Sequence, residues 1–371
     1  MQINKKRYND LDSYYKRKYN KKIIKLPLDG GFTCPNRDGT LSKRGCVYCS
    51  DEGAGEWTYK SAGDIKAQIA YQKSNLSKQG KDEGYIAYFQ NFTNTYGDVG
   101  KMREMFYSAL EDEDIVGLSI ATRADCLPDE VLDLLNELNS MTDLTVELGM
   151  QTVNDNTIKF INRGYDHESF NLGLNKLHYL GIATIAHVIV GLMNESIDDY
   201  IRDISYINDK GFWGIKIHNL YIENNTYLKY YYEKNNISYT MTKEDYANIV
   251  VMMLRNLNPG IVINRLTGDG IRANIAYPTW SKNKGAVLST IDKIYYVNSY
   301  DKEKDIYSSK ENTLLLVIDE QPKLMNTMEN GEQTILNTLV LINAFKEYGM
   351  PILATEQYPK GLGRSDDRLL A

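Results

Sequence analysis

Short apolar runs recur along most of this chain, separated by longer segments in which apolar residues repeat with helical spacing. Each run is rich in β-branched or aromatic residues and ends at polar or turn-forming residues, which is the pattern of a strand buried in a sheet. We expect strands at residues 23–28, 85–90, 116–121, 144–150, 182–190, 214–220 and 261–265.

The segments between these runs carry helix signals. Pro128 opens one, and Val131, Leu134, Leu135 and Leu138 repeat along it at helical spacing. A plausible capping box at residues 61–64 begins another. Strands that alternate with helices predict an α/β fold with a parallel sheet and right-handed crossovers. The periodicity does not decide between an open doubly wound sheet and a barrel.

Three of the four cysteines lie in one loop after the first expected strand, at residues 34–49, which we call the cysteine loop. Eleven residues separate Cys34 from Cys46, and Cys46 and Cys49 form a Cys-x-x-Cys pair. A structural zinc site uses four protein ligands, whereas an iron–sulfur cubane held by three thiolates keeps one iron open. The loop therefore favours a catalytic metal centre in a reducing compartment. A zinc site completed elsewhere is the alternative.

The sequence of this loop resembles that of the YhcC-like radical S-adenosylmethionine (SAM) proteins, a bacterial family related to the catalytic subunit of Elongator. The resemblance lies in GFTCPNRDGT, followed by GCVYCS. Later blocks resemble that family in the same order, and the resemblance covers about residues 5–298: YFQNFTNTY, LSIATRADCLPDE, VELGMQT, INRGYDH, HVIVGLMNE, IKIHNLY and INRLTGDG. Most radical SAM enzymes place three residues between the first two cysteines, so the longer spacing here is a departure.

The resemblance implies a partial (β/α)6 barrel within residues 18–300, with its active site at the C-terminal ends of the strands. It implies a [4Fe-4S] cluster on Cys34, Cys46 and Cys49, with SAM bound at the open iron. An electron from a partner such as a flavodoxin or ferredoxin would then release a 5′-deoxyadenosyl radical.

The resemblance makes further residues candidates for binding SAM, most of them at or near the ends of the expected strands: Tyr48, Gln90, Asn91, Thr93, Asn94, Arg123, Glu147, Gln151, Arg163, Ile189 and Gly191. Glu147 is the stronger candidate beside Arg123 and Gln151, because a charge within an apolar strand is costly unless it is paired or faces a polar site. Arg163 has the fork geometry that binds a carboxylate. Asn and Thr at these positions are equally typical of ordinary turns.

Two histidines and one cysteine are candidates for catalysis. His187 and His218 lie within expected strands and are candidates for a direct role in proton transfer, although a core histidine with satisfied hydrogen bonds shows the same pattern. Cys126 follows the third expected strand and is a candidate hydrogen donor or radical relay. A small buried apolar residue is the other interpretation, because free cysteines commonly pack that way.

The net charge of −6 hides a basic N-terminal segment, residues 1–50, with twelve Lys or Arg against four Asp. Tyr8, Tyr14, Tyr15 and Tyr19 lie among these charges. Basic side chains interleaved with aromatic rings suit a surface that follows phosphates and stacks bases, while a solvated helix face has the same charge pattern. The family resemblance favours contact with tRNA, next to the cysteine loop.

From about residue 308 the sequence changes character. Residues 308–371 resemble the opening of isochorismatase-like cysteine hydrolases, with a strand that ends at Asp319, a helix, and a second strand running into TEQYPKGLG. That chemistry needs a nucleophilic cysteine and a lysine, but no cysteine follows Cys126, and Lys360 lies in the wrong motif. We expect a short, inactive βαβ-like fragment that is dispensable, whose strand at 314–318 is unpaired and prone to aggregate.

These observations predict a radical SAM enzyme that modifies the wobble-uridine side chain of tRNA, a reaction to which some members of the family are linked. One alternative is a radical SAM enzyme that acts on a protein or a small metabolite, and another is a non-catalytic, zinc-bound RNA-binding module. The N-terminus is charged without an apolar leader, and no stretch is long enough to span a bilayer. We therefore expect a cytoplasmic protein without a membrane partner.

Overall fold

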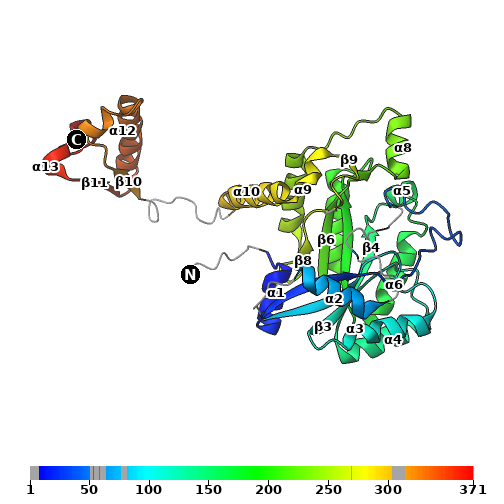
Figure 1. Ribbon diagram of the computed structural model, residues 1–371. Coiled ribbons are helices and arrows are strands. Elements are labelled where there is room, and N and C mark those ends of the chain that lie inside the picture. The colour runs from blue at the N-terminus through cyan, green and yellow to red at the C-terminus, as the bar shows by residue number, and fades with distance from the viewer. Residues whose placement is uncertain are drawn as a thin grey trace. The chain divides into compact units, whose positions relative to one another are not determined.

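The computed structural model describes residues 8–50, 53, 58, 64–76, 82–268, 270–302 and 314–370. The chain forms two compact units, Met1–Tyr295 and Tyr296–Ala371 (Figure 1). Among the described residues, no helix has the length and apolar character needed to cross a bilayer.

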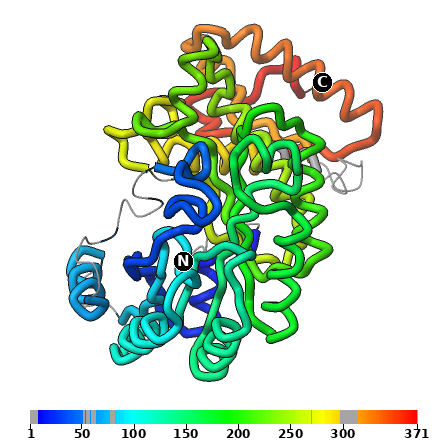
Figure 2. Tube along the Cα trace, turned by 90° about the vertical axis from the view of Figure 1, so that its right-hand side faces the viewer, coloured from blue at the N-terminus to red at the C-terminus, as the bar shows by residue number. Residues whose placement is uncertain are grey.

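A seven-stranded sheet forms the centre of the larger unit. Its strands are parallel and lie in chain order, with the last beside β6. They are β1 (Lys22–Leu28), β2 (Glu83–Phe89), β3 (Ile115–Thr122), β4 (Asp143–Gln151), β5 (Ala183–Val190), β6 (Gly214–Asn219) and β8 (Val262–Arg265). All seven expected strands are confirmed, with ends that differ by at most two residues. The sheet curls into a partial barrel (Figures 1 and 2), which confirms the expected fold class.

Helices connect consecutive strands, and most of them bury their apolar faces against the outside of the sheet: α2 (Ile65–Leu76), α3 (Val99–Leu110), α4 (Asp129–Met141), α6 (His167–Tyr179), α7 (Ile197–Lys210) and α9 (Lys243–Asn256). The shorter helices α5 (Asp155–Phe160) and α8 (Tyr227–Lys234) instead pack in a second apolar cluster that includes Val47 of the cysteine loop. The helix expected after Pro128 is α4, and its predicted apolar residues are buried. The capping box expected at 61–64 begins outside the described residues, although the Asp64 carboxylate accepts a hydrogen bond from the backbone of Ala67.

A short extension follows the barrel strands. It contains an antiparallel ribbon of β7 (Ile222–Glu223) and β9 (Ile275–Tyr277), a 3-10 turn at Thr279–Lys282, and the long helix α10 (Lys284–Lys302). Val287 and Ile291 of α10 are fully buried and belong to the same apolar core as the barrel. The first part of α10 is therefore part of the barrel unit.

Helix α1 (Leu11–Tyr19) packs at the N-terminal ends of the barrel strands. Tyr14 meets Trp213, just before β6, edge to face at 5.1 Å between ring centroids. Lys18 forms an ion pair with Asp143, where β4 begins, and Asp10 bridges to Ile263 in β8. The cysteine loop instead follows the C-terminal end of β1, so α1 and this loop lie at opposite ends of the barrel.

This placement corrects the expectation that the basic residues interleaved with Tyr14, Tyr15 and Tyr19 border the cysteine loop. Tyr15 is buried. Tyr19 is half-buried, with its ring beside that of Tyr15, the Lys18 ammonium over the ring and its hydroxyl donating to Asp143. Lys16 pairs with Asp12 in the same helix. Residues 1–7 lie outside the described part of the chain.

The second unit is a small α/β fragment. Its strands β10 (Leu315–Ile318) and β11 (Ile352–Thr355) are parallel neighbours joined through α12 (Gly331–Glu347). The short helices α11 (Pro322–Met325), α13 (Pro359–Leu362) and α14 (Asp367–Leu370) complete it. The expected βαβ arrangement is confirmed, but the expectation of an unpaired first strand is wrong, because β11 pairs with it along its whole length.

We expect a chain that ends at Lys302 to unfold at the same temperature as the full chain. The second unit has an apolar core of its own, made by Val317, Met325, Ile335, Ile342 and Leu369, so its removal takes no side chain from the barrel core. Differential scanning calorimetry of the barrel transition measures this.

A second truncation provides the control. A chain that ends at Asn283 also loses Val287 and Ile291 from the barrel core, and burial of each such side chain contributes about 1.5–3 kcal/mol. Its melting temperature should therefore fall. A fall of similar size on removal of residues 303–371 alone would contradict the independence of the two units.

Candidate active site

A cavity of about 270 Å³ opens where the barrel strands end. The cysteine loop covers one side of it, and residues of β2 to β8 and of the loops that follow them line the rest. Of the candidate residues named from sequence, this cavity brings together Cys34, Cys46, Cys49, Tyr48, Gln90, Thr93, Arg123, Glu147, Gln151, Arg163, His187, Ile189 and His218.

Backbone hydrogen bonds hold the Cys-x-x-Cys turn against the barrel. The Cys49 amide donates to the carbonyl of Cys46 at 3.0 Å and closes the turn. Between these cysteines, the Val47 amide donates to Ile161, after α5, and the Val47 carbonyl accepts from Leu228 in α8. The pair of thiols is thus fixed between two elements that are distant in sequence.

The three thiols suit a cluster better than a single metal ion. Burial raises the pKa of Cys49 to about 12 and also raises the pKa of Cys46, so a metal must displace their protons on binding. Within the described ranges, no three His, Cys, Asp or Glu side chains are arranged to share one ion. A cubane does not require that convergence, because each thiolate binds its own iron.

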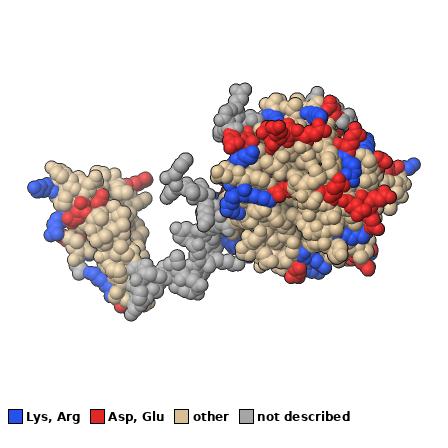
Figure 3. Space-filling model, turned by 90° about the horizontal axis from the view of Figure 1, so that it is seen from below, with Lys and Arg blue, Asp and Glu red and all other residues tan. Residues whose placement is uncertain are grey.

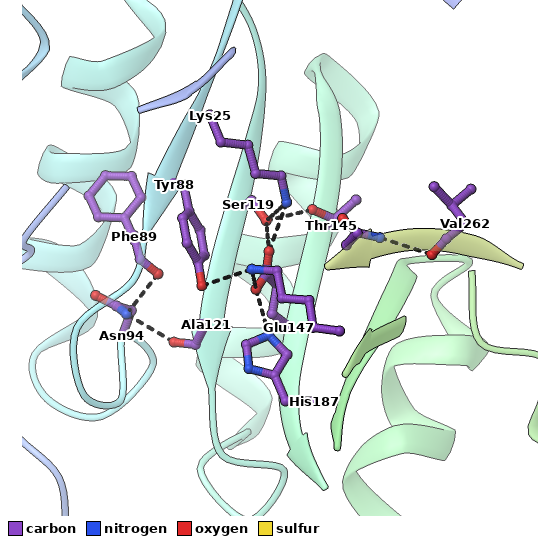
Figure 4. A network of polar contacts seen from close by, with 12 residues as sticks. Lys25, Tyr88, Phe89, Asn94, Ser119, Ala121, Thr145, Glu147, His187 and Val262 are labelled. Carbon is purple, nitrogen blue, oxygen red and sulfur yellow. Dashed lines mark hydrogen bonds and ion pairs between the residues drawn. The ribbon is translucent and has the colours of Figure 1, made fainter. Parts of the chain in front are cut away.

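A buried carboxylate organises the interior of the barrel below these thiols. Glu147, on β4, is 1% exposed. It accepts hydrogen bonds from Lys25 on β1 at 2.8 Å, Ser119 on β3 at 2.7 Å and His187 on β5 at 2.6 Å (Figure 4). Lys216 on β6 also donates to it. One side chain therefore connects five of the seven strands.

The ionisation of this network follows from burial and mutual attraction. Burial alone would raise the pKa of Glu147, but the charges of Lys216 and Lys25 and the His187 hydrogen bond hold it well below its usual value. Burial lowers the pKa of Lys216 to about 7 against the attraction of Glu147. Lys216 is thus a buried amine that can hold or release a proton near neutral pH, and it also donates to the Tyr88 hydroxyl at 3.0 Å.

The second histidine of the cavity is neutral. Burial, followed by the charges of Arg265 and of the neighbouring His187, holds the pKa of His218 well below its usual value. Its Nε2 is buried and has no hydrogen-bond partner among the residues that the structure describes. The two imidazole rings lie 5.5 Å apart between centroids. His218 therefore offers the cavity an uncommitted ring nitrogen.

Two arginines near the cysteine loop are largely occupied by protein contacts. Arg123 makes a two-pronged ion pair with Asp125, at 2.9 and 2.8 Å, and donates to the carbonyl of Arg163. Arg163 donates to the carbonyls of Met150 and Tyr165. Both guanidinium groups lie over the Tyr165 ring, at 4.6 and 4.3 Å. Of the Arg163 guanidinium nitrogens, Nη2 alone has no hydrogen-bond partner among the residues that the structure describes, so the capacity of Arg163 for a ligand carboxylate is small.

Four sequence candidates are not among the residues that line the cavity. Asn94 donates to the carbonyls of Phe89, Asn91 and Ala121, and so joins the ends of β2 and β3 (Figure 4). The amide of Asn91 donates to Thr58. The Oδ1 atoms of both side chains are buried and have no hydrogen-bond partner among the described residues, so a role of Asn91 and Asn94 in binding SAM stays a prediction.

The remaining two are Gly191 and Cys126. The backbone of Gly191 donates to the Tyr200 hydroxyl, and a side chain there would meet the Tyr239 hydroxyl at 3.2 Å. Its φ of 100° also favours glycine, and the expected contact with SAM stays a prediction. Cys126 is 8% exposed, and burial raises the pKa of its thiol to about 12, as expected for a packed cysteine.

Sequence reasoning missed several residues that line the cavity or support it: Lys25, Arg37, Tyr88, Lys216 and Arg265. For Lys25 and Lys216 a signal existed. Each is a charged residue within an apolar strand, as Glu147 is. The cost of burying an unpaired charge, which makes Glu147 a candidate, applies equally to the two lysines. Arg37 lies in a loop whose folding no periodic pattern predicts.

Known proteins resemble this chain over most of its length. Residues 39–207 match the model of the radical SAM superfamily, and residues 212–296 match that of the radical SAM C-terminal domain. YtqA of Bacillus subtilis (strain 168) is 42% identical over 288 residues, which are 78% of this chain and 89% of YtqA. YhcC of Escherichia coli (strain K12) is 33% identical over 76% of this chain and 90% of its own. The chain belongs to the YhcC-like radical SAM proteins.

The solved structure of Elp3 from the archaeon Methanocaldococcus infernus, lacking residues 1–46, has the same fold. It matches 73% of this chain and 63% of that one with a TM-score of 0.55, at 15% sequence identity. As a radical SAM enzyme, the protein uses a [4Fe-4S] cluster and SAM as cofactors. The cysteine loop offers the three thiols that such a cluster needs.

We expect Glu147→Gln to lower the free energy of unfolding by about 3–5 kcal/mol, because removal of one partner leaves buried charges uncompensated. Lys25 and Lys216 would both lose their carboxylate. Urea denaturation measures the change.

Glu137→Gln is the matched control, since it breaks an exposed ion pair with Arg103 on the outer helices, and such pairs contribute little. If both variants changed stability equally little, Glu147 would not organise the barrel interior.

Proposed function

We propose that this radical SAM enzyme modifies the wobble-uridine side chain of tRNA. The observation that carries the proposal is a basic and aromatic surface beside the cysteine loop, formed by Arg44, Tyr227, Tyr230 and Lys234, which we call the rim. Related proteins linked to this reaction gave the same expectation from sequence. We therefore assign the contact with tRNA to the rim, and no longer to the helical part of the basic N-terminal segment.

Cations and rings alternate along the rim. The Arg44 guanidinium lies 5.5 Å from the centroid of the Tyr227 ring, which lies 6.0 Å from that of Tyr230. The Lys234 ammonium is 5.5 Å from the Tyr230 ring. Tyr227 and Tyr230 are 42% and 54% exposed, so both rings are accessible, unlike the buried ring of Tyr15.

The rim is held close to the cofactor site. Its helix, α8, donates from the Leu228 amide to the carbonyl of Val47 at 2.9 Å, and Val47 lies between two of the cysteines. Leu228 and Tyr232 pack in one apolar cluster with Val47 and Ile161. In Figure 1, α8 lies beside the dark blue cysteine loop.

These contacts suit an unpaired stretch of RNA. Each base that stacks on a ring contributes about 1–3 kcal/mol, and the cations meet the phosphates. A base splayed from an anticodon loop would then extend from the rim toward the cavity. On the face of the molecule that Figure 3 shows, basic and acidic side chains are interspersed, so the argument rests on the rim and not on the charge of that face.

The cofactors supply one-electron cleavage of SAM and hydrogen abstraction from a C–H bond that acids and bases do not activate. Residues of the chain do the rest. Lys216, His218 and Glu147 provide hydrogen bonds and proton-holding groups below the thiols, and the apolar shell outside the barrel excludes water. A one-electron donor such as a flavodoxin or ferredoxin would complete the reaction, and such a donor fits a reducing, cytoplasmic compartment.

The second unit has no part in this proposal. Its order of strand, helix and strand, with Asp319 directly after β10, supports the likeness to the opening of an isochorismatase-like fold that its sequence suggested.

Cys49→Ala should abolish formation of 5′-deoxyadenosine from SAM under dithionite, because the cluster would lose one of its three thiolates. Chromatography of the reconstituted protein measures the product, and visible absorption reports the cluster. Cys126→Ala is the control, since that thiol does not line the cavity, and it should behave as the wild type. Formation of 5′-deoxyadenosine by Cys49→Ala at the wild-type rate would rule out the assignment.

The triple variant Arg44→Gln, Tyr227→Ala, Tyr230→Ala should bind tRNA from a strain lacking the gene at least tenfold more weakly than the wild type, because two stacking surfaces and one cation are lost. Fluorescence anisotropy at several salt concentrations measures affinity, and its salt dependence should flatten by about one counterion. Lys16→Gln with Arg17→Gln, on α1, is the control and should change neither quantity.

The substrate itself is tested by a comparison of tRNA nucleosides from cells with and without the gene. Mass spectrometry should show accumulation of an incompletely modified wobble uridine in the strain without it. Identical nucleosides in the two strains, together with unchanged tRNA binding by the triple variant, would contradict a tRNA substrate. They would favour the alternative, a protein or a small metabolite.

A further inference from the structure

The cysteine loop has an unusual length that the assignment of its three thiols does not explain. Eleven residues separate the first two cysteines, and two of them, Asn36 and Arg37, point polar atoms at ligand sulfurs. We propose that this insertion raises the reduction potential of the cluster by donating hydrogen bonds to the sulfurs of Cys46 and Cys49. The inference depends on the cluster and not on the identity of the substrate.

Arg37 contacts the third cysteine of the loop. Its Nη1 donates to the Cys49 sulfur at 3.5 Å and to the carbonyl of Ser50 at 2.5 Å. The guanidinium group also lies over the Phe92 ring, at 5.6 Å from the centroid. A side chain of Gly45 would meet the stem of Arg37 at 3.1 Å. These contacts fix a full positive charge beside one ligand of the cluster.

Asn36 contacts the second cysteine and is completely buried. Its Nδ2 donates to the Cys46 sulfur at 3.6 Å and to the carbonyl of Asn162 at 2.5 Å. Gly164 lies against its other side, where a side chain would meet Oδ1 at 3.0 Å. The backbone after β4 is therefore shaped around this amide.

The length of the loop produces this arrangement. The Arg37 amide donates to the carbonyl of Cys34 at 2.8 Å, which turns the chain immediately after the first cysteine. The Gly45 amide then donates to the carbonyl of Asn36 at 2.7 Å, just before the second cysteine. The eleven-residue segment thus turns back on itself after Cys34. This turn places Asn36 beside the sulfur of Cys46 and Arg37 beside the sulfur of Cys49.

Such contacts change the relative energies of the two redox states. The reduced cluster carries one more negative charge than the oxidised cluster, and hydrogen bonds to sulfur are among the factors that set its potential. A donor or a cation beside a ligand sulfur stabilises the reduced state more than the oxidised state. Arg37 is half-buried, where salt screens a charge less than at the surface.

The test is a redox titration of the reconstituted protein followed by electron paramagnetic resonance, with three proteins. Arg37→Gln removes the charge and keeps a donor, whereas Arg37→Met removes both at similar length. The midpoint potential should decrease from the wild type to Arg37→Gln and further to Arg37→Met. A structural role alone would not produce this order.

Lys43→Gln is the matched control, because Lys43 carries the same charge in the same loop and is exposed. Its midpoint potential should equal that of the wild type. Equal potentials for all four proteins would overturn the proposal, and so would an equal decrease in Lys43→Gln. Loss of iron and sulfide from both Arg37 variants would also overturn it, because Arg37 would then be needed to assemble the site and not to set its potential.

Discussion

A single buried carboxylate determines what this barrel can contain. Glu147 accepts hydrogen bonds from side chains on β1, β3, β5 and β6. Two lysines can point into the interior only because this carboxylate meets them, since an unpaired buried charge is very costly. The interior is therefore polar and lined by ionisable groups, whereas the apolar core lies between the sheet and the outer helices.

The two ends of the barrel differ in function: one end is closed by structural contacts, and the other carries the candidate active site. Helix α1 packs at the N-terminal ends of the strands, where Tyr14 meets Trp213 and Lys18 meets Asp143. The C-terminal ends carry the cysteine loop, the cavity and the neighbouring helix α8. The basic residues therefore form two groups. Those on α1, such as Lys18, make structural contacts at the N-terminal ends of the strands, whereas Arg44 and Lys234 lie on the rim beside the cysteine loop.

The seven strands could be predicted from the sequence because strands of a parallel sheet are largely buried and read as short apolar runs, whereas the choice of a partial barrel came from the family resemblance. All seven runs are strands. Glu147 was recognised by the cost of a charge in such a run, and the same argument applied to Lys216 would have found its partner. Asn36 and Arg37 were beyond that reasoning, because their roles depend on how an irregular loop folds back. The position of α1 was predicted wrongly, since adjacency to the cysteine loop in sequence does not show at which end of β1 a helix packs.

The central claim is that three thiols of the cysteine loop hold a cluster with one open iron inside a polar barrel. The most direct measurement is electron paramagnetic resonance of the anaerobically purified, reduced protein before and after addition of SAM, together with iron and sulfide analysis. We predict four irons and four sulfides per chain, and a cubane signal that changes when SAM binds the open iron. Zinc in place of iron, or a cubane signal that SAM leaves unchanged, would contradict the account.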